Sequence, residues 1–404
     1  MKKTLTLTVC FVFLMALTAS ARTLMVGGLE LEFQSVQAAI DAAAPGDLIQ
    51  ISGGVYRESL VIDKDGLDVV GAGSGQTVIE SSGIVVSYRQ AQQGRLEGLT
   101  LRYVGTDDLP ALMLDHSSPL VVNNEITGAT LSGVEIQSNA EPVLLNNRIH
   151  DNGGSGVLVY LNAQADLMNN TIESNGLDTR HAGVEVRGGA SATLRFNKVL
   201  LSGGSGVFLH EGARAQLVGN SLIGNALHGV AVLDRASAQV VSNSIWWNTE
   251  VGIRVKQSRD VSISGNFIAH NLIGLLVNEF NTPLPQEADN LFLVNTRDTR
   301  GIGLSTQDLL LSKQVVTYPD LNPMLQALGK VGEVVQSLKQ TDPAAELGAT
   351  LISTAQSAEL FGADLFRLTG LLDEAKTRYQ IVVQLDLNSQ AANEARARLE
   401  ALAP

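Results

Sequence analysis

The stretch NNRIHDNGGSGVLVY, residues 146–160, decides the fold of this chain. It holds three asparagines and three glycines around short apolar steps at Ile149 and Val157. Glycine in a helix interior costs about 1 kcal/mol relative to alanine, and asparagine favours turns. Alternate apolar residues at 157 and 159 indicate a short strand. The stretch therefore predicts turns and strands, and it raises the question of which fold needs asparagine at these places.

The stretch is one unit of an internal repeat. An asparagine ahead of a short apolar step recurs at intervals of 23, 23, 27, 23, 23 and 23 residues, and glycine follows most of these asparagines nine residues later. Apolar residues keep fixed offsets from them, so each unit reads as three short strands separated by turns. The asparagines of this column are Asn124, Asn147, Asn170, Asn197, Asn220, Asn243 and Asn266.

A unit of this length cannot bury its apolar side alone, so neighbouring units must stack. Three strands per turn with like residues in register predict an all-β solenoid, a right-handed parallel β-helix. Stacked coils lie about 4.8 Å apart, so each asparagine amide can donate to the carbonyl of the next coil. We interpret the column as a structural ladder. Asparagine would also tolerate a left-handed turn backbone there, and glycine would fill positions with no room for a Cβ.

With these columns the chain resembles the PbH1 repeats of the pectin-lyase-like superfamily, most closely the NosD/CASH type, whose name stands for carbohydrate binding and sugar hydrolysis. The resemblance covers roughly residues 30–295. It implies the β-helix fold and directs the search for function toward carbohydrates. Two better-known activities do not follow. The catalytic stretches of pectinesterases are absent, and the polygalacturonase-like segments around His228, Asn248 and Arg254 occur in the wrong order and provide one carboxylate, Glu250.

The N-terminus predicts export. Lys2 and Lys3 precede an apolar run from Leu5 to Leu17 and a small-residue cleavage site ending at Ala21, which is typical of a secretory signal peptide over residues 1–21. A periplasmic or secreted protein without membrane insertion is expected. The one cysteine lies inside the apolar run, so no disulfide or thiolate metal site is expected. A net charge of −13 argues against nucleic acid as a partner.

The rest of the chain divides by composition. Residues 22–46 predict an N-terminal strand and a cap helix with Phe33, Val36, Ile40 and Ala43 on one stripe, followed by the β-helix at 47–300. A linker is expected at 301–320. Residues 321–404 are rich in Ala, Leu, Gln and Glu at helical spacing and resemble one tetratricopeptide repeat with its capping helix, with a plain helical hairpin as the alternative. We expect a contact region for a protein partner there.

Candidate chemistry lies on the strand after each glycine, whose second and fourth residues point outward. This places Tyr160, Arg187 and His210 in one column on adjacent coils. A cation that neutralises a uronate carboxylate, with His and Tyr as base and acid, is what β-elimination or C5 epimerisation requires. The alternative is a solvated sheet face. Further substrate-binding candidates are Glu185, Glu211, His181, Arg254 and Lys256.

Three functions remain open at this level. The first is an exported β-helix that binds carbohydrate or scaffolds a partner, without a catalytic site. The second is a uronate-polysaccharide lyase or C5-epimerase that uses Tyr160, Arg187 and His210. The third is a NosD-like periplasmic assembly factor that acts on a protein. Neither a cofactor nor a metal site is expected, because the histidines share no coil position and no aspartates cluster.

Overall fold

The structure is a computed structural model. It describes residues 21–278 except Leu29 and 178–180, together with 286–288, 290–293 and 295–296. In the C-terminal region it describes residues 360, 376, 379–380, 382–383 and 389–402. The proposed signal peptide up to residue 20, the linker at 301–320 and most of the helical region lie outside the described residues.

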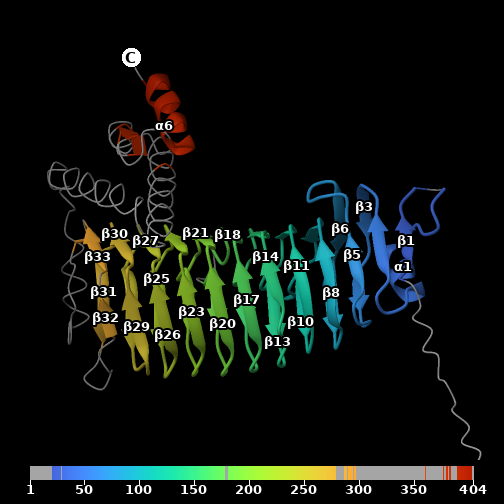
Figure 1. Ribbon diagram of the computed structural model, residues 1–404, viewed down its shortest axis with the longest axis horizontal. Coiled ribbons are helices and arrows are strands. Elements are labelled where there is room, and N and C mark those ends of the chain that lie inside the picture. Colours follow the sequence, from blue (N-terminus) through green and yellow to red (C-terminus); the bar gives the residue numbers. More distant parts are fainter. Residues whose placement is uncertain are drawn as a thin grey trace, which may run out of the picture.

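The described strands form three parallel sheets that run the length of a solenoid (Figure 1). Sheet A consists of β1 (Thr23–Val26), β2 (Leu48–Ile51), β5 (Asp68–Val70), β8 (Gln92–Glu97), β11 (Ser118–Val122), β14 (Val143–Leu145), β17 (Gln164–Met168), β20 (Ser191–Arg195), β23 (Arg214–Val218), β26 (Ser237–Val241), β29 (Val261–Ser264) and β32 (Gln286–Ala288). Sheet B consists of β3 (Gly54–Arg57), β6 (Thr77–Ser81), β9 (Thr100–Tyr103), β12 (Glu125–Thr127), β15 (Arg148–His150), β18 (Thr171–Glu173), β21 (Lys198–Leu200), β24 (Ser221–Ile223), β27 (Ser244–Trp246), β30 (Phe267–Ala269) and β33 (Leu291–Leu293). Sheet C consists of β4 (Leu60–Ile62), β7 (Val86–Arg89), β10 (Leu112–Asp115), β13 (Val134–Gln137), β16 (Val157–Val159), β19 (Val184–Val186), β22 (Val207–Leu209), β25 (His228–Leu233), β28 (Val251–Lys256) and β31 (Ile273–Asn278).

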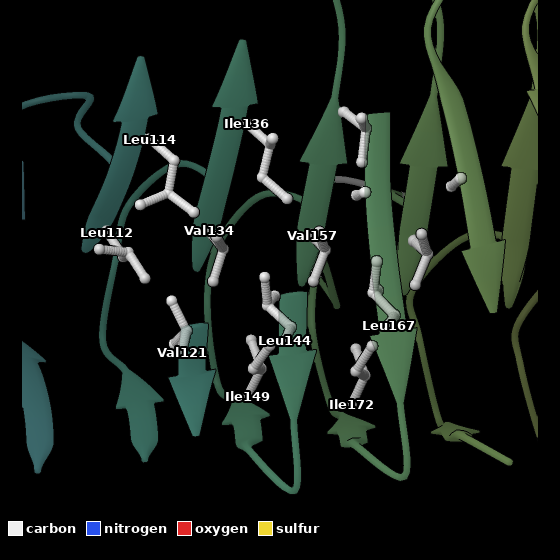
Figure 2. Packing of buried hydrophobic residues seen from close by; sticks show 14 of the residues in the cluster. Leu112, Leu114, Val121, Val134, Ile136, Leu144, Ile149, Val157, Leu167 and Ile172 are labelled. Carbon is white, nitrogen blue, oxygen red and sulfur yellow. The ribbon is translucent and has the colours of Figure 1, made fainter. Parts of the chain in front are cut away.

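Each strand pairs with the equivalent strand one coil away, so the predicted parallel β-helix is confirmed. Inside the solenoid, like side chains stack in rows along the axis (Figure 2). Val134, Val157 and Val184 of sheet C are fully buried in one such row. Burying an aliphatic side chain of this size stabilises a fold by about 1.5–3 kcal/mol, so the rows hold the coils together without specifying a ligand.

The asparagine column forms a continuous ladder between sheets A and B. Both the backbone N–H and the Nδ2 of Asn147 donate to Oδ1 of Asn170, at 2.9 and 3.0 Å, and Nδ2 also donates to the Val121 carbonyl at 2.9 Å. The same pattern links each member to the next from Asn124 to Asn266, and on to Asn290. The members from Asn124 to Asn266 are at most 2% exposed, so each rung between them satisfies buried polar groups that water cannot reach.

The backbone conformation at these turns differs from the expectation. The left-handed residue is the one before each ladder asparagine, such as Asn146 (φ 56°) or Asn169 (φ 53°), and not the ladder asparagine itself. The glycine column has a steric cause. A Cβ at Gly133 would lie 2.6 Å from Asn152 Nδ2 and 2.9 Å from the Gly156 carbonyl oxygen, so no other residue fits.

A second ladder, which the sequence analysis missed, runs five residues after the first. Asn152 donates to Asn175 at 2.9 Å, and Asn225 donates to Asn248 at 2.8 Å. Asn271 and Asn295 continue the column. Ser202 interrupts it: its hydroxyl is buried and has no hydrogen-bond partner within the described residues. One coil of this ladder therefore lacks the amide that bridges its neighbours.

The helix α1 (Val36–Ala42) closes the N-terminal end of the solenoid and packs against β1, β2 and β4. Ser35 caps it, and Glu58 accepts hydrogen bonds from the Ser35 hydroxyl and the Val36 amide. Phe33 was expected on the helix stripe, and this is wrong. It precedes the helix and bridges Val26 in the manner of a strand, because the cap at Ser35 starts the helix only afterwards.

The described part of the C-terminal region contains helix α6 (Gln390–Ala401), capped by Ser389. Tyr379, Val382 and Ala395 are buried together there, as two helical segments packed on each other require. Ala363, Phe366, Gly370, Leu372 and Ala375 of the tetratricopeptide pattern lie outside the described residues. Among the helices that the structure describes, none is long and apolar enough to cross a membrane.

The interrupted ladder yields a stability prediction. Ser202→Asn should raise the free energy of unfolding by about 1 kcal/mol, because an amide at this position can accept from Asn175 and donate to Asn225. Urea unfolding followed by circular dichroism measures the change. The matched variant Asn248→Ser places the same gap between two intact neighbours, Asn225 and Asn271, and should destabilise by about 1–3 kcal/mol. Destabilisation by both substitutions would contradict this account, because it would show that the site is packed around serine and cannot accommodate an asparagine.

Candidate functional site

The outward face of sheet C carries the predicted cluster. Parallel register places Glu135, Leu158, Glu185 and Phe208 in one row, each on the coil after the last. Tyr160, Arg187 and His210 follow two residues later on their own coils, directly after β16, β19 and β22. Residues 23–27 apart in sequence thus become neighbours about 4.8 Å apart along the axis.

Glu185 is the hub of this cluster. Its side chain is 12% exposed, and its Oε1 lies 3.1 Å from Nε2 of His210 and 3.7 Å from Nε of Arg187. Its Oε2 accepts a hydrogen bond from the Ser155 hydroxyl at 2.9 Å and lies 3.8 Å from Nδ1 of His181. One carboxylate from β19 therefore holds groups from three coils, and we call these residues, with Tyr160, Glu135 and Glu211, the Glu185 cluster.

Tyr160 joins the cluster to the preceding coil. Its hydroxyl donates to Oε1 of Gln137 and lies 3.4 Å from Oε2 of Glu135. The guanidinium carbon of Arg187 lies 5.6 Å from the centre of the Tyr160 ring, within cation–π range. The phenol is thus fixed on one side by acceptors and on its face by a cation.

On the other side of the cluster, the His210 ring stacks on Phe208, with centroids 4.3 Å apart. Nδ1 of His210 lies 3.6 Å from the exposed carboxylate of Glu211. Both ring nitrogens of His210 therefore face carboxylates, and the cluster joins every predicted site residue of this region. Asp178 and Arg180 of the 27-residue unit lie outside the described residues.

Burial and hydrogen bonding separate the two inner carboxylates. Burial acts to raise the pKa of Glu185, but hydrogen bonds from His210 and Ser155, with the charge of Arg187, hold it below its ordinary value. Burial raises the pKa of Glu135, opposed by the Tyr160 hydroxyl and Arg187. Burial, then the neighbouring Glu135, raises the pKa of Tyr160 to about 12. Glu185 is the more firmly ionised of the two, and the phenol stays protonated at neutral pH.

Arg254 and Lys256 do not join the cluster. Register places them two coils beyond Phe208 and His210. Nη1 of Arg254 lies 3.1 Å from Nε2 of the buried His228, whose Nδ1 is 3.8 Å from Glu250. Burial, followed by the charge of Arg254, lowers the pKa of His228 to about 3, so this imidazole is neutral at pH 7. The group is a separate polar contact on the same sheet.

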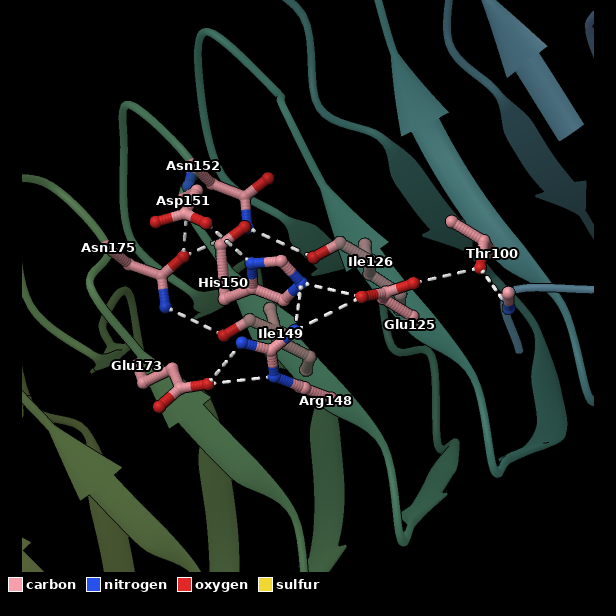
Figure 3. Close-up of polar contacts among 11 residues, drawn as sticks. Thr100, Glu125, Ile126, Arg148, Ile149, His150, Asp151, Asn152, Glu173 and Asn175 are labelled. Carbon is pink, nitrogen blue, oxygen red and sulfur yellow. Dashed lines mark hydrogen bonds and ion pairs between the residues drawn. The ribbon is translucent and has the colours of Figure 1, made fainter. Parts of the chain in front are cut away.

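A second polar cluster, on sheet B, was not anticipated (Figure 3). Oε1 of Glu125 lies 3.1 Å from both Arg148 Nη1 and His150 Nε2. Nδ1 of His150 lies 2.7 Å from Asp151, and Arg148 also pairs with Glu173 at 2.8 Å. Burial acts to raise the pKa of Glu125, but hydrogen bonds from His150 and Thr100 keep it low. Each carboxylate in this cluster contacts Arg148 or His150, which is typical of a structural network.

The sequence contained a signal for this second cluster. Its members stand one and three residues after a ladder asparagine, as Glu125 does after Asn124 and His150 does after Asn147. These positions flank the inward-pointing residue of sheet B and therefore point outward. Comparing them coil by coil, as was done for the residues after glycine, would have placed Glu125, Arg148, His150 and Glu173 together.

Comparisons with known proteins agree with this geometry. The chain matches the family model described as "Right handed beta helix region" over residues 74–199 and the model "Periplasmic copper-binding protein (NosD)" over residues 165–303. No curated protein matches it. These two matches and the three parallel sheets agree on a right-handed β-helix, and over residues 165–303 the chain is similar to the NosD family.

Two solved structures illustrate the fold similarity. The A-module of the mannuronan C-5 epimerase AlgE6 of Azotobacter vinelandii has a TM-score of 0.58 and 20% identity, over 67% of this chain and 91% of that chain. The A-module of AlgE4 from the same organism has a TM-score of 0.53 and 19% identity, over 67% and 92%. At this identity the likeness establishes the fold alone.

Copper, which the NosD description names, does not fit the described residues. Among them, no group of three or more His, Cys, Asp and Glu side chains is arranged to hold a metal ion. In the Glu185 cluster, the carboxylate already accepts hydrogen bonds from Ser155 and His210. No step of the function proposed below passes through a metal.

The low pKa of Glu185 yields a pH-dependent prediction. A carboxylate whose pKa is lower in the folded chain stabilises the fold above its unfolded pKa, and this contribution is lost as the pH falls through the folded pKa. Glu185→Gln should therefore cost about 1–3 kcal/mol near pH 7 and progressively less in acid. Urea unfolding across a pH series measures this. Glu211→Gln, at an exposed carboxylate, is the control and should show little change. A penalty for Glu185→Gln that is independent of pH would contradict the assignment.

Proposed function

We propose that the protein is an exported carbohydrate-binding β-helix, and that the Glu185 cluster on sheet C is its binding face. The observation that carries this proposal is the grouping of partly buried carboxylates, a guanidinium and aromatic rings on successive coils. Sugars present vicinal hydroxyls and apolar C–H faces. Carboxylates accept hydrogen bonds from hydroxyls, arginine donates in a planar fork, and aromatic rings cover the C–H faces.

The direction of the cluster matches a polymer. Tyr160, Arg187 and His210 lie on three successive coils, so their groups repeat about every 4.8 Å along the axis. A sugar chain laid parallel to the axis would meet one of these side chains per coil. Arg187, which is half-exposed beside Tyr160, is the group that would pair with a uronate carboxylate.

The geometry supports binding more than turnover. A general base needs a free lone pair near the proton that it removes. Both nitrogens of His210 instead face carboxylates, Glu185 at 3.1 Å and Glu211 at 3.6 Å. With a pKa of about 12, Tyr160 keeps its proton at neutral pH and cannot serve as the base. Neither His210 nor Tyr160, the two groups predicted to move protons, is therefore free to accept a proton from a bound sugar.

The second candidate is a uronate-polysaccharide lyase or C5-epimerase. One observation favours it: Tyr160, Arg187 and His210 are immediate neighbours, which gives an acid, a cation and an imidazole on one face. The two Azotobacter structures are mannuronan C-5 epimerases and share this fold. For turnover, substrate would have to displace a carboxylate from His210 and so free the imidazole.

A third candidate is an assembly factor of the NosD type. The match over residues 165–303 to a family described as periplasmic supports it, as it does a periplasmic location. In that case residues 321–404, which we propose to be tetratricopeptide-like, would contact the protein partner. Residues 1–21 would be the signal peptide that directs export.

Substitutions at His210 separate binding from catalysis. Mature wild-type protein should bind members of a polysaccharide panel without releasing unsaturated or epimerised product. His210→Ala and Arg187→Ala should each weaken binding severalfold, since each removes one of several contacts. Calorimetry measures the affinity. Ultraviolet absorbance detects unsaturated uronates, and proton NMR detects epimerised residues. Arg57→Ala, an exposed arginine on sheet B, is the control.

Two outcomes would overturn this proposal. The first is wild-type turnover that collapses in His210→Ala while affinity is retained, since a general base contributes typically 10²–10⁴-fold to rate and little to ground-state binding. That result would establish the lyase or epimerase. The second is that neither substitution changes the affinity for any glycan on the panel. This face would then be only a solvated sheet surface.

A further inference from the structure

Three arginines of the solenoid stand apart from the rest. The other arginine side chains within residues 21–278 that the structure describes bind a partner: Arg22, Arg57, Arg89, Arg95, Arg102, Arg148, Arg187, Arg195 and Arg254. Arg214, Arg235 and Arg259 are exposed and make no ion pair or side-chain hydrogen bond with the described residues.

These three arginines line one groove. It is a depression of about 700 Å³ on the outer face of sheet A, between β14 and the turn before β29, on a different sheet from the Glu185 cluster. Its floor is polar and in register: Thr193 on β20, Gln216 on β23 and Gln239 on β26 face outward on successive coils. No aromatic side chain lines it. Such a floor can hydrogen bond along a hydroxylated chain but offers no apolar pocket for a peptide or lipid.

The charges in the groove are unevenly placed. At its N-terminal end, Nη1 of Arg195 donates to both carboxylate oxygens of Asp166, at 2.9 and 3.0 Å, and Glu141 accepts a hydrogen bond from Gln164. At the other end, Arg214, Arg235 and Arg259 face one lining carboxylate, Asp260. This end is therefore locally cationic on an acidic protein, and it attracts anions where the rest of the surface repels them.

The arginines lie on three successive coils, with Arg214 at the start of β23 and Arg235 and Arg259 in the turns before β26 and β29, so they step along the axis without forming one row. Arg214 belongs to the coil of β22–β24, Arg235 to the coil of β25–β27 and Arg259 to the coil of β28–β30. One guanidinium per coil gives a repeat of about 4.8 Å along the axis, comparable to the advance of one sugar in an extended chain. A ligand that carries one anion per sugar would satisfy all three at once.

We infer that the groove on sheet A is a second binding site, which takes an extended acidic polysaccharide with one carboxylate per sugar. Arg214, Arg235 and Arg259 pair with successive carboxylates, and Gln216 and Gln239 donate to or accept from the sugar hydroxyls. The site does not depend on the function proposed for the Glu185 cluster. It is on another sheet, and it requires charge on the ligand, which the Glu185 cluster does not.

The test uses a fluorescent oligogalacturonate long enough to span the groove, with full-length mature protein. The triple variant Arg214→Gln/Arg235→Gln/Arg259→Gln should lose affinity about tenfold, each exposed cation contributing a factor of about two. Anisotropy measures binding, and the loss should shrink as salt is raised, since the contacts are exposed. The matched control Arg57→Gln/Arg89→Gln/Arg102→Gln removes the same charge from the N-terminal coils and should bind like wild type.

Two further arms make the outcome decisive. The carboxyl-reduced oligomer should not distinguish wild type from the triple variant, because its anions are gone. In the His210→Ala background, the salt-sensitive loss of affinity caused by the three groove substitutions should remain. A failure of the function proposed for the Glu185 cluster can therefore be distinguished from a failure of the groove site. The inference is overturned if wild type does not bind the oligogalacturonate, if both triple variants lose affinity equally, or if the groove variant binds normally. Equal affinity for single-stranded DNA would reject a polysaccharide as the specific ligand.

Discussion

The structure depends on one interaction, the hydrogen bond from an asparagine amide of one coil to the asparagine carbonyl of the next. At Asn147 the backbone N–H and Nδ2 both donate to Asn170, and Nδ2 also reaches the Val121 carbonyl. The turn between two short strands buries these polar groups, where each unsatisfied group costs about 1–3 kcal/mol. The ladder satisfies them with a partner that exists only if the coils are in register. A slip of two residues would keep the apolar side chains pointing inward, but it would separate the asparagines of the ladder.

Fixed register makes the surface as regular as the interior. It brings Tyr160, Arg187 and His210 together although 23 or more residues separate them, and it places Arg214, Arg235 and Arg259 on successive coils along another face. A rigid face of this kind presents groups at the period of an extended polymer with little ordering cost on binding. The two surfaces differ in chemistry: the first is a closed network around a carboxylate, and the second is a polar groove with an exposed arginine on each of three successive coils. The fold supplies the spacing, and the residues at outward positions supply the specificity.

Much of this could be predicted from the sequence, because a repeat converts sequence offsets into spatial columns. The ladder asparagines and the Tyr160 column follow from counting alone. The second ladder was hidden because Ser202 interrupts its column and because Asn152 reads as an ordinary turn residue beside two glycines. The hub role of Glu185 depends on side-chain rotamers across three coils, and the groove depends on how far the turns project. Phe33 is a further example: apolar periodicity placed it in the helix, but the position of the cap at Ser35 determines where the helix begins.

The central claim is that the ladders, and not the apolar rows alone, fix each coil against the next. The most direct measurement is native-state hydrogen exchange by NMR at the backbone amides of Asn147, Asn170 and Asn220, which donate to side-chain oxygens and lie outside every strand. The account predicts protection equal to that of neighbouring strand amides such as Val184. Exchange as fast as at the exposed turn residue Leu161 would show that the ladder opens independently of the coils, and would contradict the account.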